Sequence, residues 1–172
     1  SHDHDHSHDH DHSHDHDHSH DHDHGHSHDH DRDAQGTGPH RSAAEVLEVV
    51  AGMDLPERAA ADARATFELL ATAEAAVHGT EPDRVHFHEV GEDDALADVV
   101  GACLLLDDLD PDRVVTTPVA AGGGSVRASH GTYPVPAPAT VELAERASWT
   151  LRGGPVEAEL LTPTGAAILA TI

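Results

Sequence analysis

Two groups of histidines dominate the chemistry available to this sequence, and the larger one is at the start. Residues 1–33 hold 15 of the 20 histidines and 11 of the 33 acidic residues, and residues 1–24 repeat Ser-His-Asp-His-Asp-His four times. Neutral imidazole is a good ligand for zinc, copper, cobalt and nickel, and the interleaved aspartates attract cations and add oxygen ligands. This His/Asp tract therefore predicts metal binding without selecting the metal. The alternatives are an acidic linker and a purification tag, and the alternation with aspartate argues against the tag.

The second group is the segment His86-Phe-His-Glu89. On a β-strand His86 and His88 point to one face, and Phe87 and Glu89 point to the other. Two imidazoles about 6–7 Å apart on one face can share a metal ion. The alternative is a half-exposed strand in which Phe87 is buried and the histidines only face water.

Two carboxylates follow on a predicted helix. Asp94 and Asp98 are four residues apart and so share a face. Asp98 has apolar neighbours on both sides in the sequence, so we expect it to be buried, where a carboxylate needs a cation, a metal ion or several donors. Asp98 is therefore a candidate metal ligand. Asp94 is weaker evidence, because with Glu92 and Asp93 it lies in a first helical turn, where the dipole favours acids.

A glycine-rich segment carries the third set of candidates. Gly122-Gly123-Gly124 permits close approach of the backbone to a ligand, and Arg127 is a candidate for binding a phosphate. Neither Gly-x-Gly-x-x-Gly nor Gly-x-x-x-x-Gly-Lys-[Ser/Thr], the two glycine patterns typical of nucleotide binding, is present. A tight loop is therefore the alternative interpretation of the three glycines. His130 is a further candidate for ligand binding, with an exposed loop histidine as its alternative.

The elements that must position these residues indicate an α+β fold, with helices packed on a small mixed sheet and a disordered His/Asp-rich tail in front. Residues 1–33 contain no apolar residue and cannot form a core. Residues 1–41 are therefore expected to be tract and linker, and residues 42–172 one domain. We expect strands at 84–90, 114–117 and 125–128, and helices at 42–50, from a cap at 54–57 to residue 78, at 93–109, at 139–146 and from 162.

Local signals support the helices. Ser42 and Glu45 have capping-box spacing, and Gly79 is a helix stop. In the second helix Ala63, Phe67, Leu70 and Val77 fall on one face, which we expect to be buried. The helix at 93–109 is apolar over most of its circumference and should be buried. The final helix start lies close to Ile172 and the chain begins at Ser1, so we expect a fragment.

The composition limits the classes of partner that the chain is expected to bind. The net charge is −24 and the chain has no lysine, so no basic footprint for nucleic acid or an anionic membrane is expected. No run of about 18 apolar residues occurs, so no membrane span is expected. The single Cys103 cannot form an internal disulfide, which makes a reducing cytosol the expected location.

Longer motifs resemble those of the LarC family, the nickel insertion proteins of lactate racemase cofactor synthesis. The resemblance covers about residues 42–172, and the family commonly carries a His-rich insertion before this region. The motifs that carry it, in the family's order, are Ala73-Glu-Ala-Ala-Val-His-Gly79, Val85-His-Phe-His-Glu-Val-Gly91, Asp94-Ala-Leu-Ala-Asp-Val-Val-Gly101, Gly122–Gly124, His130-Gly131, Pro134-Val-Pro-Ala-Pro-Ala-Thr140 and Leu161-Thr-Pro-Thr-Gly-Ala-Ala167.

The resemblance implies a nickel chelatase, or cyclometallase, of the lyase class. Such enzymes insert nickel into pyridinium-3,5-bisthiocarboxylic acid mononucleotide, in a CTP-dependent reaction, to give the nickel-pincer nucleotide. It also implies lactate racemase or its maturation proteins as partners, and a family region for the triphosphate that we do not find after Ile172. The family has small or apolar residues at positions 92 and 93, so those two acids are expected to be exposed bystanders.

The roles of the individual residues are assigned from the chemistry of their side chains and not from the family. His86 and His88 are expected to bind nickel, with Asp98 as a ligand or an orienting carboxylate. Glu89 or Asp94 is expected to take the ring proton that nickel replaces. The other hypotheses are a non-catalytic nickel or zinc storage and delivery protein and, with least support, a metal-dependent hydrolase.

Overall fold

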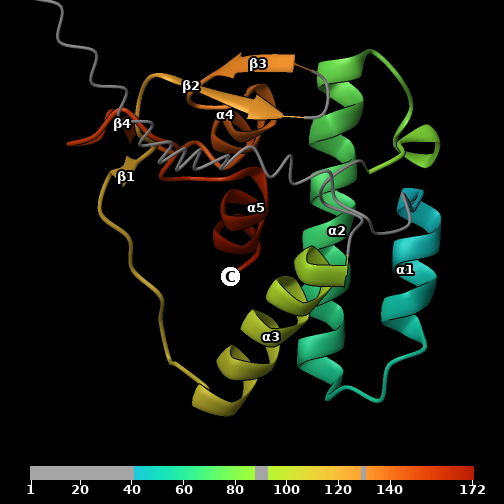
Figure 1. Ribbon diagram of the computed structural model, residues 1–172. Coiled ribbons are helices and arrows are strands. Elements are labelled where there is room, and N and C mark those ends of the chain that lie inside the picture. Colours follow the sequence, from blue (N-terminus) through green and yellow to red (C-terminus); the bar gives the residue numbers. More distant parts are fainter. Residues whose placement is uncertain (1–40, 88–92, 129–130) are drawn as a thin grey trace, which may run out of the picture. The chain divides into compact units, whose positions relative to one another are not determined.

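The computed structural model describes residues 41–87, 93–128 and 131–172 (Figure 1). By its contacts the chain divides into residues 1–33 and residues 34–172, and all described elements belong to the second part. The predicted disorder of the His/Asp tract falls outside the described residues. The elements in chain order are α1 (Ala43–Ala51), α2 (Glu57–His78), the 3₁₀ turn η1 (Pro82–Arg84), α3 (Asp93–Leu109), β1 (Val119–Ala120), β2 (Ser125–Ala128), β3 (Gly131–Pro134), α4 (Pro138–Arg146), β4 (Leu151–Arg152) and α5 (Pro163–Thr171).

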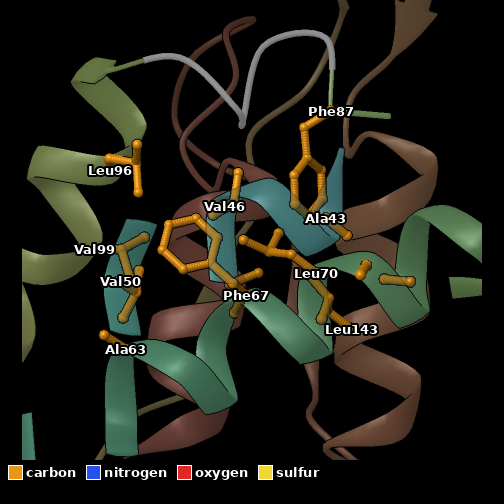
Figure 2. Packing of buried hydrophobic residues seen from close by; sticks show 14 of the residues in the cluster. Ala43, Val46, Val50, Ala63, Phe67, Leu70, Phe87, Leu96, Val99 and Leu143 are labelled. Atoms are coloured by element: carbon orange, nitrogen blue, oxygen red, sulfur yellow. The ribbon is translucent and has the colours of Figure 1, made fainter. Parts of the chain in front are cut away.

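Helix α2 is the centre of the fold, because α1, α3, α4 and α5 all pack against it. Phe67 and Leu70 of α2 are fully buried, and the Phe67 ring lies 6.4 Å from that of Phe87, centroid to centroid (Figure 2). Small side chains let the other helices approach α2 closely, and alanine also favours the helix itself. The buried alanines of α2 are Ala59, Ala63, Ala71, Ala73 and Ala75.

Short-range signals set most of the helix ends. The Ser42 hydroxyl accepts from the Glu45 N–H at 3.2 Å, and Glu45 Oε2 accepts from the Ser42 N–H at 2.7 Å, so the predicted capping box begins α1. Gly79 ends α2 in the left-handed conformation, as predicted. The side-chain cap of α2 predicted at residues 54–57 is wrong, because Pro56 occupies the N-cap position and no side chain bonds to that end of the helix.

The sheets are small and separate, which corrects the single mixed sheet expected from the sequence while confirming the α+β class. β1 pairs with β4 in parallel, with Val119 opposite Leu151. β2 pairs with β3 antiparallel, with Ser125 opposite Pro134. The core is therefore mostly helix against helix around α2, and the strands lie at its margin (Figure 1).

Two predicted strands are wrong within the described residues. The segment at 84–90 makes one antiparallel bridge, between His86 and Ser42, and continues outside the described residues. The segment at 114–117 forms no strand, and Val115 is 72% exposed. Both segments have β-favouring side chains, but a strand also needs a neighbour, and β-propensity carries no information about that neighbour.

Helix α3 begins and ends at the predicted residues, yet only one side of it is buried. Leu96, Val99 and Cys103 are buried, whereas Leu105 and Leu109 are 66% and 72% exposed, so the expected burial around most of the helix is wrong. The prediction for Val77 on α2 is also wrong, because this residue is exposed. No helix among the described residues is both long and apolar enough to cross a membrane.

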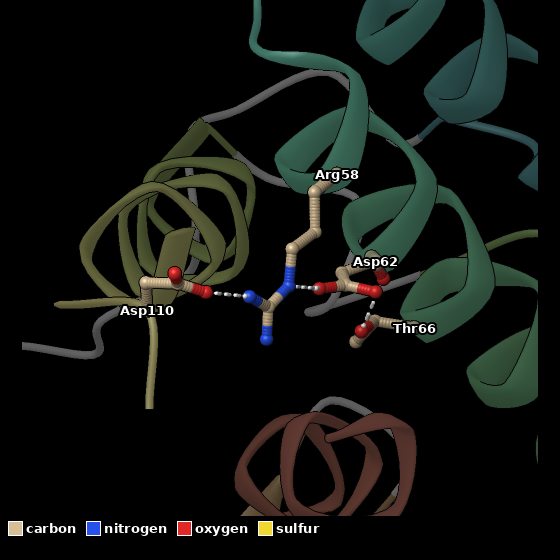
Figure 3. Close-up of polar contacts among 4 residues, drawn as sticks. All are labelled: Arg58, Asp62, Thr66 and Asp110. Atoms are coloured by element: carbon tan, nitrogen blue, oxygen red, sulfur yellow. Dashed lines mark hydrogen bonds and ion pairs between the residues drawn. The ribbon is translucent and has the colours of Figure 1, made fainter. Parts of the chain in front are cut away.

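Polar contacts join the start of α2 to the end of α3. Arg58 Nη1 lies 2.8 Å from Asp110 Oδ1, and Arg58 Nε lies 3.8 Å from Asp62 Oδ2 (Figure 3). Thr66 donates to the Asp62 carbonyl oxygen one turn back. Burial raises the pKa of the nearby Cys103 thiol, and the charge of Asp62 acts in the same direction, so the thiol stays protonated at neutral pH.

Candidate metal site

His86 lies on a short backbone ladder that joins the start of the domain to the segment after η1. The Ala43 N–H donates to the Val85 carbonyl at 3.0 Å, and the Phe87 N–H donates to the Arg41 carbonyl at 2.9 Å. These two bonds flank the bridge between Ser42 and His86. Main-chain hydrogen bonds of its neighbours therefore fix the backbone position of His86.

Side chains alternate along this ladder as the sequence predicted. Val85 and Phe87 are 4% and 2% exposed, whereas His86 between them is exposed. The apolar pair enters the core (Phe87 in Figure 2), which turns the His86 imidazole toward water. His88 and Glu89 lie outside the described residues, so the same-face prediction for His88 stays a prediction.

The first turn of α1 adds a negative charge near His86. The Ser42 N–H and hydroxyl, both bonded to the Glu45 carboxylate, hold the pKa of Glu45 below its usual value, and the charges of His86 and Arg41 act in the same direction. Glu45 is thus ionised at neutral pH and lies close enough to His86 to interact with it. A cation at His86 gains from this carboxylate even without direct coordination.

An ion pair ties the start of α3 to the same ladder. Arg41 Nη1 lies 2.8 Å from Asp93 Oδ1, and the Arg41 side chain is only 20% exposed. Asp93 is exposed, as expected, and its carboxylate pairs with Arg41 of the ladder, so the expectation that it has no functional role stays a prediction. Glu92, the other expected bystander, lies outside the described residues.

Asp94 and Asp98 lie on the solvent side of α3, and the prediction that Asp98 is buried is wrong. Leu96, Val99 and Val100 enter the core, whereas Asp98 is exposed, so water can hydrate the carboxylate. Asp94 Oδ1 accepts from the Ala95 N–H at 2.8 Å. Within the described ranges no three His, Cys, Asp or Glu side chains come together to hold a metal ion. The roles assigned to Asp94 and Asp98 therefore stay predictions.

The three glycines contact another part of their own chain. The Gly123 N–H donates to the Ala158 carbonyl at 3.2 Å, and Gly122 bridges to Glu159. A Cβ at Gly122 would overlap the Ala158 carbonyl oxygen, and a Cβ at Gly124 would lie 3.1 Å from Glu157 Oε2. This geometry explains the glycines by the tight-loop alternative, and it supplies no support for a phosphate cradle.

Arg127 and His130 remain isolated as candidates. Arg127 is exposed on β2, opposite Thr132 of β3, and His130 lies outside the described residues.

Three features of this region were not predicted from the sequence: Arg41, its ion pair with Asp93, and Glu157 beside the glycines. None of these contacts leaves a local signal, because each joins segments far apart in the chain; only the capping box of Ser42 and Glu45 could be found from spacing.

The candidate site within the described residues thus consists of one outward-facing imidazole, His86, on a short backbone ladder, and imidazole is a side chain that transition-metal ions favour. Residues 5–172 match the family described as "Nickel insertion protein". The chain belongs to this family. No solved structure matches the chain.

The names of similar proteins agree with the family description. A protein of Picosynechococcus sp., whose name includes the words nickel insertion protein, is 48% identical over 134 residues, which is 78% of this chain and 32% of the relative. A protein of Methanosarcina mazei with the same words in its name is 50% identical over 132 residues, 76% of this chain and 33% of the relative.

One relative has a more specific name. The "Pyridinium-3,5-bisthiocarboxylic acid mononucleotide nickel insertion protein" of Staphylococcus saprophyticus is 41% identical over 130 residues, 76% of this chain and 33% of that protein. The chain thus spans about a third of the length of the curated relatives that it matches.

Proposed function

We propose that this chain takes part in inserting nickel into pyridinium-3,5-bisthiocarboxylic acid mononucleotide, to give the nickel-pincer nucleotide that serves as the cofactor of lactate racemase. The nickel insertion family and the name of the Staphylococcus relative support the metal and the substrate. The observation that carries the proposal is His86, an exposed imidazole at an isolated backbone bridge that two main-chain hydrogen bonds flank. Such a ligand can take up a metal ion and release it without moving the fold.

The reaction is a cyclometallation by a nickel chelatase of the lyase class, and nickel is one of its substrates. Nickel becomes bonded to two sulfurs and one ring carbon, and the hydrogen on that carbon leaves as a proton. His86 and His88 hold the ion before transfer through imidazole nitrogens. Glu89 or Asp94 accepts the ring proton. Asp98, exposed on α3, assists as a ligand or by orienting an imidazole.

The CTP dependence that the family resemblance implies finds no fitting site among the described residues. Gly122, Gly123 and Gly124 pack against residues 157–159 of their own chain, and the Glu157 carboxylate beside Gly123 and Gly124 opposes a triphosphate. We therefore derive no step through CTP. Arg127, exposed on β2, is the candidate for the single phosphate of the mononucleotide.

Lactate racemase or one of its maturation proteins is the proposed partner, because the finished cofactor must reach that enzyme. The cytosol is the proposed location. Its support is Cys103, the only cysteine, which is free and buried and so fits a reducing compartment.

A non-catalytic storage and delivery protein is the second candidate function. The observation in its favour is the His/Asp tract, with 15 histidines in 33 residues. A tract without fixed geometry buffers metal ions better than it catalyses a reaction. In this alternative the domain serves to dock a recipient protein.

Mass spectrometry separates the two functions. The chain is incubated with nickel, CTP and the bisthiocarboxylate mononucleotide, and a product carrying nickel and two thiocarboxylates is expected. Nickel uptake with unchanged mononucleotide would favour storage.

A His86→Ala/His88→Ala double variant should abolish tight binding of nickel to the domain. Normal nickel affinity in this variant would mean that the segment at 86–89 has a structural role or contacts the substrate.

A further inference from the structure

The carboxylate of Glu45 is held next to His86 by the residue that pairs with His86. Ser42 forms the antiparallel bridge with His86, and the same serine begins α1 as its N-cap. The start of α1 lies beside η1, from which the chain runs on to His86 (Figure 1). We propose that Glu45 is a ligand of the nickel ion together with His86, through its oxygen Oε1. This proposal rests on the proposed function, in which His86 binds nickel before its transfer.

The register of the bridge puts the side chains of Ser42 and His86 on one face. Two main-chain hydrogen bonds flank this pair, one on each side, so it is a non-hydrogen-bonded pair. In such a pair the Cα atoms are about 4.5 Å apart and the side chains are close. Because His86 is exposed, the shared face is turned to water.

The capping box holds the Glu45 carboxylate on the Ser42 side chain. Oε2 of Glu45 accepts from the Ser42 N–H at 2.7 Å and from the Ser42 hydroxyl at 2.9 Å. Since this hydroxyl lies on the face of His86, the carboxylate lies there too, and it interacts with the charge of His86. Imidazole is longer than the serine side chain, so a staggered rotamer can bring a ring nitrogen up to the carboxylate.

One oxygen of this carboxylate is left for a metal ion. Both hydrogen bonds of the cap go to Oε2, and no hydrogen bond or ion pair within residues 41–87, 93–128 and 131–172 reaches Oε1 of Glu45. Zinc binds imidazole nitrogen and carboxylate oxygen at about 2.0–2.2 Å, and a nickel ion with similar bonds needs the two donor atoms about 3–3.5 Å apart. The hydrogen bonds from Ser42 would then orient the ligating carboxylate, as the outer contacts of metal ligands commonly do.

The charges around the pair favour a cation. Glu45 is exposed and ionised at neutral pH. Arg41 also acts on Glu45, but Asp93 lies 2.8 Å from the guanidinium and offsets its charge. Residues 34–172 carry 22 acids and eight arginines, so the wider field attracts a divalent ion as well.

Two protein ligands suit an ion that must be handed on. Nickel(II) prefers square-planar or tetragonal surroundings, so His86 and Glu45 by themselves leave at least two positions open, for water or for the sulfurs of the mononucleotide. Carboxylate oxygen is a harder ligand than imidazole, so a thiocarboxylate sulfur should displace Glu45 before His86. In the part of the chain that the structure describes, no third His, Cys, Asp or Glu joins the pair.

The test measures nickel affinity in the full chain, with the 15 histidines of residues 1–33 replaced by asparagine so that the tract does not compete. Titration with nickel chloride should give one tight site in this background chain. Glu45→Gln and His86→Ala should each weaken it at least about tenfold, since even an outer contact of a metal ligand is worth ~10–100-fold. Glu48→Gln, at an exposed glutamate one turn further along α1, is the matched control and should change the affinity by less than twofold.

Salt separates a ligand from a charge that attracts the ion through water. The Debye length falls from about 10 Å at 0.1 M salt to about 3 Å at 1 M. A bond between Oε1 and nickel is not screened, so the affinity ratio of the background chain to Glu45→Gln should agree within about twofold at these two salt concentrations. A ratio that falls to one at the higher concentration would overturn the role of Glu45 as a ligand.

A further variant separates the carboxylate from the helix cap. Glutamine at position 45 can still accept from the Ser42 N–H in a capping box, so Glu45→Gln should keep α1 folded. Ser42→Ala removes the capping hydroxyl but leaves the carboxylate. It should therefore lower the melting temperature more, and the nickel affinity less, than Glu45→Gln does. A loss of nickel affinity in Ser42→Ala as large as that in Glu45→Gln would show that binding follows the cap, and would overturn the proposal.

The outcomes separate the inference from the proposed function. If His86→Ala loses affinity but Glu45→Gln stays within twofold of the background chain, the carboxylate ligand is wrong and His86 remains the nickel ligand of the proposed function. If His86→Ala itself stays within twofold, the proposed site at His86 is wrong, and the inference falls with it whatever Glu45→Gln does.

Discussion

Asp98 and its neighbour Leu96 differ in surroundings although both lie in the first half of α3. Leu96 is 5% exposed and belongs to the core, whereas the Asp98 carboxylate faces water. A hydrated carboxylate needs no partner in the fold, so Asp98 can serve a metal ion without any role in stability.

This contrast predicts a matched pair of effects. Asp98→Ala should change the free energy of unfolding by less than about 0.5 kcal/mol, as for most surface changes. Leu96→Ala should lower it by ~2–5 kcal/mol, because it leaves a cavity between packed helices. Urea denaturation at pH 7 measures both. A large loss in Asp98→Ala would mean that the carboxylate has a buried partner, contrary to the exposed position.

Glu45 predicts a pH dependence of stability. Its pKa is lowered in the folded chain from the ordinary 4.5, mainly by the Ser42 N–H, so its contribution is present above pH 4.5 and is lost as the pH falls through the folded pKa. The stability difference between the parent and Glu45→Gln should therefore shrink between pH 7 and the acid side of 4.5. Denaturant melts at several pH values measure it, with Glu48→Gln on the same helix as the control. A difference independent of pH would contradict the capping role.

At the scale of elements, the glycine loop and its partner segment show how a contact between distant parts of the chain determines residue type. Gly122 has φ +95°, a region that L side chains rarely adopt, and its Cα faces the Ala158 carbonyl. Gly123, next to it, has no contact closer than 3.5 Å for an added Cβ and no positive φ. Of these two glycines only Gly122 is required by its backbone conformation; Gly124, the third glycine of the loop, also has a positive φ, +79°.

Gly122→Ala should lower the free energy of unfolding by about 2 kcal/mol or more, because it combines a disfavoured φ with an overlap that the backbone must move to relieve. Gly123→Ala should change it by less than about 1 kcal/mol. Thermal melts of the two single variants make the comparison. Equal losses would show that the loop needs both glycines for another reason, such as a bound ligand, and would reopen the phosphate-cradle interpretation.

The helices were predictable because their signals are local. Ser42 with Glu45, Gly79, and Thr162 ahead of α5 lie within one turn of the ends that they define. The strands were not, because each depends on a partner far along the chain: His86 pairs with Ser42, and Val119 pairs with Leu151. β-favouring runs without such a partner, as at 114–117, remain exposed loops.

In the candidate site, too, features with a local sequence signal were predictable, and contacts between distant segments were not. The outward direction of His86 was predictable, because Val85 and Phe87 on either side are apolar and must enter the core. The burial of Asp98 was predicted wrongly, because neighbours in a helical sequence point to different sides. The ion pair of Arg41 with Asp93 joins two segments that no local pattern relates.

At the scale of the whole molecule, the tract and the domain are both acidic. The first 33 residues carry 11 acids and one arginine, a charge of −10, and the remaining residues carry 22 acids and eight arginines, a charge of −14, which together give −24 with histidine neutral. Both parts therefore attract cations over several ångströms, and salt should weaken this attraction. The tract differs from the rest of the chain in its number of imidazoles, because it holds 15 of the 20 histidines.

Deleting residues 1–33 should lower the number of nickel ions bound per chain and leave at least one tighter site. The tract supplies many similar imidazoles in a sequence repeat, whereas the domain holds His86 on a backbone ladder that two main-chain hydrogen bonds fix. Isothermal titration of the parent and the truncated chain measures both numbers. The weak sites of the parent should also fade between about pH 7.5 and 5.5, since protonated imidazole cannot bind a metal ion. If the truncated chain, still folded by circular dichroism, binds no nickel at pH 7.5, then the tract is the only metal-binding part of this chain, and storage and delivery become the better account of what it does.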